Sequence, residues 1–386
     1  MINCNNQAYF FLEIKHILLC GLNLIPVFLK MVELRLLIAY GSLGKLFHLK
    51  EFSKELEKQN VQVKLVKDTD YSRGFPSTKI SEWFNGDEKF KQLIEDFKPD
   101  AIFTDRQTHF ALHSIKSKIP TFVLLRGHYW QEYFWAMKTL GSNLKIRIAI
   151  WFRNRIANKV FEEATAIFPI CKYLEDVVKE IHPNQNTGVF LEGISSDRWH
   201  HTEKMELKHP CVGLVQDANW WGKTKELLVL EKVLEKMPYV NFYWVGDGQY
   251  RKKITDVLEK FDNFQWLGRL EYPDQVRMFL ETIDVYALIT GMDLAPLTLK
   301  EAQLMEKPVI ATDVGGDKEM MSDRKTGFLV EEGNSDDIIE KISELLDNQE
   351  LCEQMGKNGA NFVKENFNWE LVVENFLHNI KPFLNK

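Results

Sequence analysis

Two carboxylates, Asp293 and Glu301, lie eight positions apart around the start of an expected short helix. Pro296 is predicted as the first helical residue, where its missing N–H costs nothing. The N–H groups of Leu297 and Thr298 would then point out of the helix N-terminus, which is a ready site for an anion. Glu301 could accept hydrogen bonds from hydroxyl groups of the same ligand. A straight helix would hold the two acids about 12 Å apart, so Asp293 must lie in the preceding loop to share that ligand. Spacing alone supports equally a structural alternative, in which Asp293 is a solvent-exposed loop residue and Glu301 an ordinary surface residue of the helix.

A second candidate loop follows the first strand-like run of the chain. Gly41 and Gly44 open a helical segment there, and two glycines let a backbone approach a ligand closely. Lys45 could face phosphates or an acceptor. The spacing is not that of the Gly-x-Gly-x-x-Gly fingerprint, so binding of a dinucleotide is the weaker interpretation.

Strands that alternate with helical segments would position these loops. Apolar runs bounded by glycine or polar turns are typical of parallel strands buried on both faces, and their alternation with helices predicts an α/β fold. A polar stretch over residues 195–209 interrupts the pattern, and a helix over residues 224–237 belongs to the second half. The expected strand-bearing segments are residues 34–40, 61–66, 98–105, 119–128, 164–178, 211–215, 241–245, 264–268, 284–289 and 308–312. In such sheets ligands bind beyond the carboxyl ends of the strands.

Composition narrows the functional classes. The chain has 386 residues, enough for two domains, and 45% hydrophobic with 27% charged residues is a globular composition. A net charge of −6 argues against a nucleic-acid-binding protein. The five cysteines are scattered without a Cys-x-x-Cys pair, which predicts neither a disulfide framework nor a zinc site and is typical of a reducing cytoplasm.

Residues 1–30 do not fit either half. Their apolar run, residues 17–29, is too short to span a bilayer and contains Asn23 and Pro26. We expect a loosely attached extension or a mis-assigned start before Met31. A segment that touches a membrane is the lesser alternative.

The run from Ile289 to Val330 resembles the nucleotide-sugar motif of retaining family-four glycosyltransferases, the glycosyl transferases group 1, which have the GT-B fold of two Rossmann-like doubly wound domains. The features that carry the resemblance are Glu301, the segment "PVIATDVGG" (Pro308 to Gly316), Glu319 and "TGFLV" (Thr326 to Val330). The resemblance extends over nearly the whole chain from about Met31. It places the active site in the cleft between the two domains.

The resemblance implies a role for each matching residue. Glu301 would hold the nucleotide ribose, the amides of Leu297 and Thr298 beside Pro296 would hold the diphosphate, and Asp293 would contact the donor sugar. Further donor-binding positions are Lys223, with Lys225 as an alternative, at the phosphates, and Gly246 and Gly268 near the base. His128, at the end of a strand, would lie beside the donor sugar, although a lone histidine is more often structural.

Two departures from the family pattern stand out. Asp293 replaces a glutamate and is one methylene shorter. The arginine expected shortly after the strand at residues 211–215 is missing, because "QDANWWGKTKE" stands there. Loss of one cation would weaken the stabilisation of charge that develops on a leaving diphosphate.

The resemblance also implies the domain organisation. Residues 31–205 would form an acceptor domain and residues 206–366 a nucleotide-sugar donor domain. Residues 367–386 look like the C-terminal helix that crosses back onto the first domain in GT-B proteins.

The function implied is transfer of a sugar from a UDP- or GDP-sugar to a hydroxyl of a glycan or lipid-linked acceptor, as in polysaccharide biosynthesis. Retention of configuration is implied, with no bound metal and no cofactor beyond the co-substrate. We expect a cytoplasmic protein that could also be peripheral at the inner membrane face. The alternatives are a catalytically silent GT-B binding subunit and a GT-B epimerase or inverting transferase.

The stretch from Lys138 to Lys159 has no acidic residue. It contains aromatic side chains, Trp151 and Phe152, beside six cations: Lys138, Lys145, Arg147, Arg153, Arg155 and Lys159. A basic helix with aromatics can rest on an anionic bilayer. The alternative, which sequence alone slightly favours, is an ordinary amphipathic helix with a solvated charged face.

Overall fold

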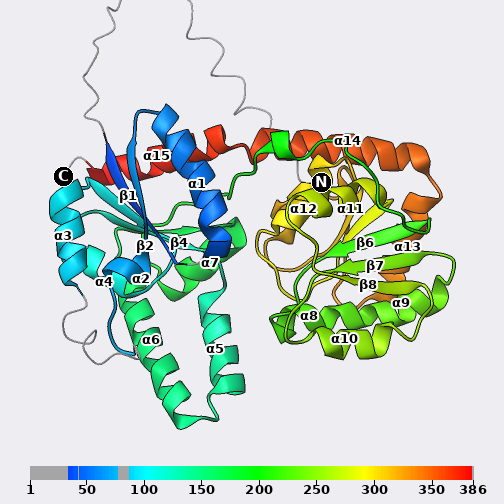
Figure 1. The fold of residues 1–386 in the computed structure, drawn as a ribbon, viewed down its shortest axis with the longest axis horizontal. Coiled ribbons are helices and arrows are strands. Elements are labelled where there is room, and N and C mark those ends of the chain that lie inside the picture. The colour runs from blue at the N-terminus through cyan, green and yellow to red at the C-terminus, as the bar shows by residue number, and fades with distance from the viewer. Residues whose placement is uncertain (1–33, 42, 77–86, 385–386) are drawn as a thin grey trace, which may run out of the picture. The chain divides into compact units, whose positions relative to one another are not determined.

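The computed structural model describes residues 34–41, 43–76 and 87–384. The expected N-terminal extension, residues 1–30, lies outside the described residues. The described residues form two sheets of parallel strands, each with helices on both faces (Figure 1). The predicted alternation of strands and helices is therefore confirmed.

The first sheet has the strand order β2-β1-β3-β4-β5. Its strands are β1 (Arg35–Tyr40), β2 (Gln62–Lys67), β3 (Ala101–Thr104), β4 (Thr121–Leu125) and β5 (Ala166–Pro169). Alternate residues of β1 enter different hydrophobic clusters: Leu36 and Ile38 share one with Phe52, whereas Leu37 and Ala39 share another with Phe90. Burial on both faces explains why the strand is an unbroken apolar run.

Helices cover both faces of this sheet. They are α1 (Leu43–Lys58), α2 (Asp68–Tyr71), α3 (Glu88–Phe97), α4 (His109–Lys116), α5 (Tyr129–Leu140), α6 (Leu144–Glu163) and α7 (Lys172–Ile181). The basic stretch is two helices rather than one. Gly141 ends α5, and the Asn143 side chain accepts hydrogen bonds from the amides of Lys145 and Ile146 at the start of α6. No described helix is long and apolar enough to cross a membrane.

The second sheet has the strand order β11-β10-β9-β6-β7-β8. Its strands are β6 (Cys211–Val215), β7 (Asn241–Val245), β8 (Phe264–Gly268), β9 (Val285–Leu288), β10 (Val309–Thr312) and β11 (Gly327–Val330). Its helices are α8 (Trp221–Thr224), α9 (Leu230–Lys236), α10 (Arg251–Leu258), α11 (Asp274–Thr282), α12 (Leu297–Leu304), α13 (Ser335–Leu346) and α14 (Gln349–Asn366).

The helix expected over residues 224–237 is partly wrong. Lys225–Val229 forms a 3₁₀ helix, η3, and only Leu230–Lys236 is α-helical. Of the residues in η3, Glu226 and Leu227 are buried, and Leu230, Val233 and Leu234 of α9 continue the buried side.

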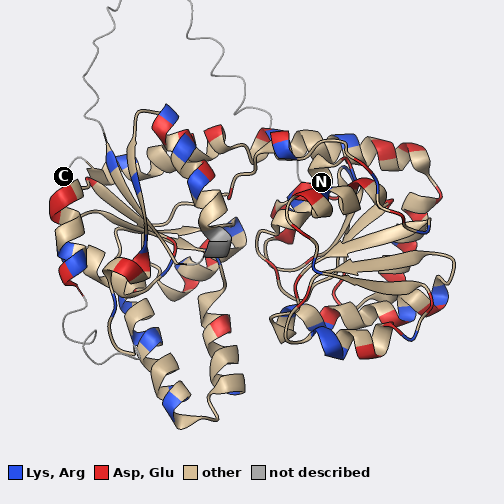
Figure 2. Cartoon of the chain, viewed as in Figure 1, with Lys and Arg blue, Asp and Glu red and all other residues tan. Residues whose placement is uncertain are grey.

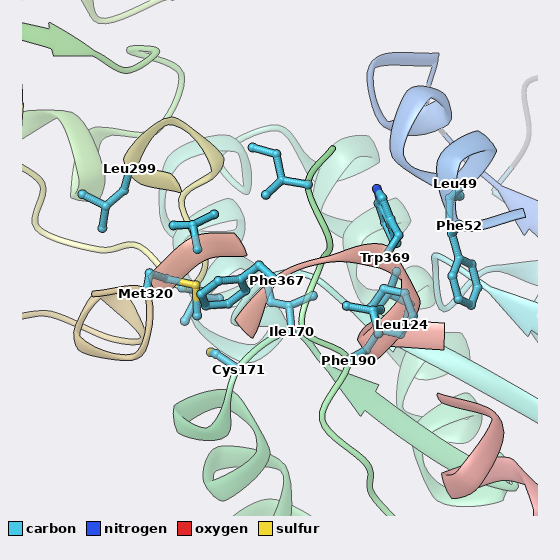
Figure 3. Close-up of a cluster of buried hydrophobic side chains, with 14 of the residues drawn as sticks. Leu49, Phe52, Leu124, Ile170, Cys171, Phe190, Leu299, Met320, Phe367 and Trp369 are labelled. Carbon is cyan, nitrogen blue, oxygen red and sulfur yellow. The ribbon is translucent and has the colours of Figure 1, made fainter. Parts of the chain in front are cut away.

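Packing joins the two halves. One cluster of buried side chains contains Leu49 and Phe52 of α1 together with Leu299 of α12 and Met320 (Figure 3). The Glu319 carboxylate accepts hydrogen bonds from the amides of Lys172 and Tyr173 at the N-terminus of α7, at 2.6 and 2.7 Å. A carboxylate at a helix N-terminus accepts hydrogen bonds from the free amides there, and its negative charge is stabilised by the positive end of the helix dipole.

The last helix, α15 (Trp369–Leu384), packs on the first sheet. Phe376 lies with its ring centroid 5.2 Å from that of Phe52 and 5.0 Å from that of Phe103. The Trp369 indole N–H donates to Glu51 of α1 at 2.9 Å. The chain thus returns to its first half after completing the second sheet.

Candidate functional site: a cavity at the carboxyl ends of the second sheet

A cavity of about 620 Å³ opens where β6, β7 and β8 end. Most of its wall comes from the loops that follow strands of the second sheet, as expected for a parallel sheet. Phe47 and His48 of α1 and Arg198 also contribute. The remaining lining residues are Val215, Gln216, Asp217, Lys223, Val245, Gly246, Arg269, Leu270, Tyr272, Pro273, Val276, Asp293, Ala295, Pro296, Leu297, Thr298 and Glu301.

The start of α12 is one of these walls. Pro296 is the N-cap and not the first helical residue, and no side chain caps this end. A cap and the first helical position differ by one residue, which is the usual uncertainty of a helix boundary. Leu297 and Thr298 line the cavity, and the Thr298 hydroxyl accepts a hydrogen bond from Tyr286 at 2.8 Å. The first turn of α12 therefore offers uncapped amides to an anion in this cavity.

Asp293 and Lys223 form an ion pair at the cavity wall. Burial lowers the pKa of Lys223, but the charge of Asp293 and its hydrogen bond more than offset this, so the pKa is raised. The lysine is therefore a cation at neutral pH. Asp293 lies in the loop before α12, as its sharing of a ligand with Glu301 requires.

A third acid, Asp317, is fully buried near this pair. Burial raises the pKa of Asp317 well above its usual range, and the charge of Asp293 raises it further, whereas Lys223 lowers it. Gly316, one residue earlier, donates its N–H to the carbonyl of Asp293 at 3.2 Å. Lys223 is thus the cation shared by two neighbouring carboxyl groups.

Glu301 lies inside α12 and is only 2% exposed. Its Oε1 accepts a hydrogen bond from the Tyr272 hydroxyl at 3.0 Å. Burial and the charge of Glu301 raise the pKa of Tyr272, so this hydroxyl remains a donor. The surface-acid interpretation of Glu301 is wrong, because the carboxylate is buried at the cavity wall.

Gly246 must be a glycine. Its φ is +145°, and an added Cβ would lie 2.0 Å from the carbonyl oxygen of Gln216. Its N–H donates to the carbonyl of Gly268 at 2.9 Å, which holds the ends of β7 and β8 together. Gly268 itself does not line the cavity, but the next two residues, Arg269 and Leu270, do.

Three predicted positions lie elsewhere. Lys225 does not line the cavity and points its Nζ to within 3.9 Å of Glu332. His128 caps α5, where its Nδ1 accepts a hydrogen bond from the Gln131 amide at 3.3 Å, and burial lowers its pKa. Gly41 also lies outside the cavity lining, and its carbonyl accepts a hydrogen bond from Arg106 at 3.1 Å. The side chain of Lys45 and the surroundings of Gly44 lie outside what the structure describes.

Several wall residues carry no recognisable signal in the sequence. Tyr272 and Phe47 meet edge to face with ring centroids 6.4 Å apart, although they are far apart in the chain. Arg198 stacks over the Phe47 ring at 3.9 Å and pairs with Glu51 at 3.1 Å. Arg269 could have been found, because it directly follows Gly268 at a strand end. It has no carboxylate within 4 Å in the described part of the chain.

A smaller cavity of about 210 Å³ lies at the carboxyl ends of β3 and β4. It is lined by Asp105, Gln107, Leu125, Arg126, Gly127 and Glu132. Burial raises the pKa of Asp105 to about 6 and also raises that of Glu132. Arg126 is held by an ion pair with Glu192.

One group among the described residues has spacing suitable for a metal ion: His209, Cys211 and Asp284, with ligand atoms within 4.8 Å of one another. It lies at the start of β6, at the opposite end of the strand from the 620 Å³ cavity. Asp284 Oδ2 already accepts hydrogen bonds from the Cys211 amide at 2.7 Å and from His209. Burial raises the pKa of the Cys211 thiol to about 12, so the thiol stays protonated. We therefore interpret these contacts as structural hydrogen bonds at the start of β6.

Known proteins resemble this chain in sequence and in structure. Residues 219–362 match the family described as glycosyl transferases group 1. A trehalose synthase from Thermococcus litoralis is 33% identical over 174 residues, which are 42% of each chain. A poly(ribitol-phosphate) alpha-N-acetylglucosaminyltransferase from Staphylococcus aureus is 26% identical over 151 residues, 39% of this chain and 31% of the relative. The chain thus spans less than half the length of these relatives.

Solved structures establish the fold. Sucrose-phosphate synthase from Thermosynechococcus elongatus superposes with a TM-score of 0.71 at 14% identity, over 91% of this chain and 99% of the other. HepE of Anabaena, solved with UDP, superposes with a TM-score of 0.65 at 14% identity, over 90% and 100%. The fold is GT-B, and the resemblance to the glycosyl transferases group 1 is confirmed for residues 219–362.

Proposed function

We propose that the protein is a glycosyltransferase that moves a sugar from a nucleoside-diphosphate sugar to a hydroxyl acceptor. The observation that carries this is the meeting, in one cavity, of the uncapped start of α12, the cation Lys223 and the buried carboxylate of Glu301. Its volume of about 620 Å³ is in the range of small-molecule sites. The family match over residues 219–362 supports the same reaction class.

The diphosphate would bind at the start of α12. The amides of Leu297 and Thr298 line the cavity there, and a helix N-terminus favours negative charge by about 0.3–2 kcal/mol. Lys223 would add a cation after exchanging part of its contact with Asp293 for phosphate. Arg269 supplies a second cation from the end of β8, in place of the arginine missing after β6.

Glu301 would accept hydrogen bonds from the ribose hydroxyls in exchange for that from Tyr272. Asp293 would orient the donor sugar, which it can reach from the loop before α12. During transfer, the bond between the anomeric carbon and the diphosphate oxygen breaks, the acceptor oxygen forms the new bond to that carbon, and the acceptor hydroxyl gives its proton to the departing diphosphate. Negative charge grows on the diphosphate, where fixed amides and cations stabilise it most in the transition state.

Three finer features belong to the proposal. Transfer proceeds with retention, which the resemblance to family-four enzymes supports. No metal ion is needed, because helix amides, Lys223 and Arg269 supply the positive charge that a metal would otherwise bring. The nucleotide is UDP or GDP, and the likeness in fold to HepE, solved with UDP, favours UDP.

The two halves divide the work. Residues 206–366 would bind the donor and residues 31–205 the acceptor, a glycan or lipid-linked glycan of polysaccharide biosynthesis, with residues 367–386 as the helix that crosses back. His128 would orient the donor sugar from the first half, and Gly41, Gly44 and Lys45 would face the donor phosphates or the acceptor. We place the protein in the cytoplasm, which suits the free Cys171, Cys211 and Cys352.

The reaction itself gives the test. Wild-type protein is incubated with UDP- and GDP-sugars and a panel of glycan acceptors, with and without EDTA. We expect a glycoside whose anomeric configuration, read from proton NMR coupling, equals that of the donor, at a rate unchanged by EDTA. An inverted product, or a free epimer of the donor sugar, would favour the corresponding alternative. Nucleotide binding without any transfer would favour the silent subunit. The aspartate at position 293 in place of glutamate, and the ion pair that holds Lys223, would then explain the missing activity.

A further inference from the structure

The hairpin of α5 and α6 carries an exposed apolar surface. Seven of the twelve exposed large hydrophobic side chains in the described residues lie between positions 134 and 152. They are Phe134, Leu140, Leu144, Ile146, Ile148, Trp151 and Phe152. All residues from 142 to 148 are exposed, and Leu144 beside the turn is 71% exposed. Apolar side chains gathered in one place on a surface mark an interaction site.

These side chains lie mainly on one face of α6. Leu144, Ile148 and Trp151 recur at helical spacing, and Arg155 and Lys159 continue the same row. The opposite side of α6 is buried through Ala157, Val160 and Phe161. An ordinary amphipathic helix would turn its apolar residues inward and only its charges outward. The first half of α6 instead exposes both kinds.

Cations surround this apolar row (Figure 2). From Lys138 to Lys159 there are six Lys and Arg residues and no acid. In the described part of the chain only Lys159 has a carboxylate within 4 Å, Glu163 at 3.6 Å. The Arg155 guanidinium lies 5.1 Å from the centre of the Trp151 ring, so an aromatic anchor and a cation share one spot.

We propose that this surface, the outer side of the α5–α6 hairpin, docks on an anionic lipid bilayer. A helix with apolar and aromatic side chains flanked by Lys and Arg lies in a membrane interface, where tryptophan is also favoured. The whole chain has a net charge of −6. Long-range charge would repel it from such a surface, so attraction must come from this hairpin at distances within a Debye length. The inference rests on the hairpin alone and not on the proposed reaction.

The test uses sedimentation with vesicles. Wild-type protein is mixed with phosphatidylcholine vesicles, pure or with a third phosphatidylglycerol, at low and high salt. We expect binding to the anionic vesicles that weakens as salt rises, and little binding to the neutral ones. Absence of binding to anionic vesicles would overturn the proposal.

Two variants localise the contact. Arg147→Gln/Arg153→Gln/Arg155→Gln removes three cations, each worth about fivefold in binding near an anionic surface, so the partition coefficient should fall about 100-fold. Leu144→Ser/Ile148→Ser/Trp151→Ser should abolish sedimentation of the protein with the vesicles, although the net charge of this variant equals that of wild type. Circular dichroism and the urea midpoint confirm that each variant is folded.

Matched controls use the second half of the chain. Lys236→Gln/Lys252→Gln/Lys357→Gln changes the net charge equally, and Tyr239→Ser removes a 62% exposed aromatic. Both should bind vesicles as wild type does. Equal binding by the hairpin variants would overturn the proposal. So would a wild-type dimer that the Leu144→Ser/Ile148→Ser/Trp151→Ser variant converts to a monomer, because the surface would then join two copies.

Discussion

The two sheets have the same parallel architecture but end in different chemical surroundings. Beyond the second sheet lies a cavity of about 620 Å³ with uncapped amides, Lys223 and Arg269. Beyond β3 and β4 of the first lies one of about 210 Å³, where burial raises the pKa of the acids Asp105 and Glu132. An anionic diphosphate is therefore expected at the second sheet, and a neutral ligand rich in hydroxyls at the first.

The carboxyl end of each sheet also contains a partly buried ion pair, and the two pairs differ in what they serve. Lys223–Asp293 lines the large cavity, so a ligand can reach it. In Arg126–Glu192 the acid is tied to the second half as well, because the carbonyl of Glu192 accepts a hydrogen bond from Lys300 at 2.6 Å. Arg126 lines the smaller cavity instead, so we infer that the first pair serves nucleotide binding and stability, and the second stability but not nucleotide binding.

The largest effect should come from breaking these pairs. Lys223→Met leaves Asp293 and Asp317 close together without a cation. Loss of one partner of a fully buried pair costs about 3–5 kcal/mol, so we expect about 3 kcal/mol for this partly buried pair. Arg126→Met should destabilise the protein similarly. Urea unfolding measures both, and Lys236→Met, at an exposed pair, should change little. Only Lys223→Met should also abolish nucleotide binding. If Arg126→Met abolished binding equally, the distinction between the two pairs would fail.

The next largest effect concerns the backbone at the carboxyl end of the second sheet. Gly246→Ala would place a Cβ 2.0 Å from the Gln216 carbonyl at a φ of +145°, and we expect a loss of about 2–3 kcal/mol. In Gly222→Ala the nearest atom is 3.8 Å away, so stability should stay near that of wild type. Urea midpoints of the two variants give the comparison. Equal midpoints would show that β7 and the Gln216 loop are not packed as described.

The carboxyl end of the first sheet should make the stability of the protein depend on pH. The pKa of Asp105 is about 6 in the folded protein, above its usual value, because the carboxyl group is buried. The folded state therefore binds the proton more tightly than the unfolded state, so stability falls as pH rises from about 4 to 6 and stays lower above 6. Asp105→Asn should remove this loss and raise stability by about 3 kcal/mol at pH 8, with little change at pH 4. Urea unfolding between pH 4 and 8 measures it. A parallel pH curve for variant and wild type would contradict this prediction.

The smallest effect concerns the exposed cation. Arg269→Gln should weaken nucleoside-diphosphate binding about tenfold, with no change in binding of the nucleoside, because only the phosphate contact is lost. Arg324→Gln removes an exposed arginine elsewhere and is the control. Titration calorimetry with UDP and uridine separates the two contributions. Equal weakening for both ligands would place Arg269 away from the phosphates.

Sequence predicted most strands of both sheets, but it predicted the site only where residues from one stretch of the chain form it. Buried strands such as Cys211–Val215 and Val309–Thr312 were clear because both faces are apolar. Asp293, Glu301 and the start of α12 come from one continuous stretch, so local spacing brought them together. Arg198, Phe47 and Tyr272 meet only through the packing of α1 against the loop before α11, which no local pattern encodes. Of the two lysines offered for the phosphates, Lys223 lines the cavity, whereas Lys225 lies with its Nζ 3.9 Å from Glu332.

The most direct test of the account is nucleotide binding to the cavity at the second sheet. Calorimetric titration with UDP, GDP and ADP would be run on wild type, Glu301→Ala and Glu340→Ala, which removes an exposed acid on α13. We predict that one nucleotide binds wild type and Glu340→Ala equally. Its affinity for Glu301→Ala should be about 30-fold weaker, as loss of a charge-assisted hydrogen bond implies. No binding of any nucleotide to wild type, or equal binding to Glu301→Ala, would contradict the assignment of this cavity as the donor site.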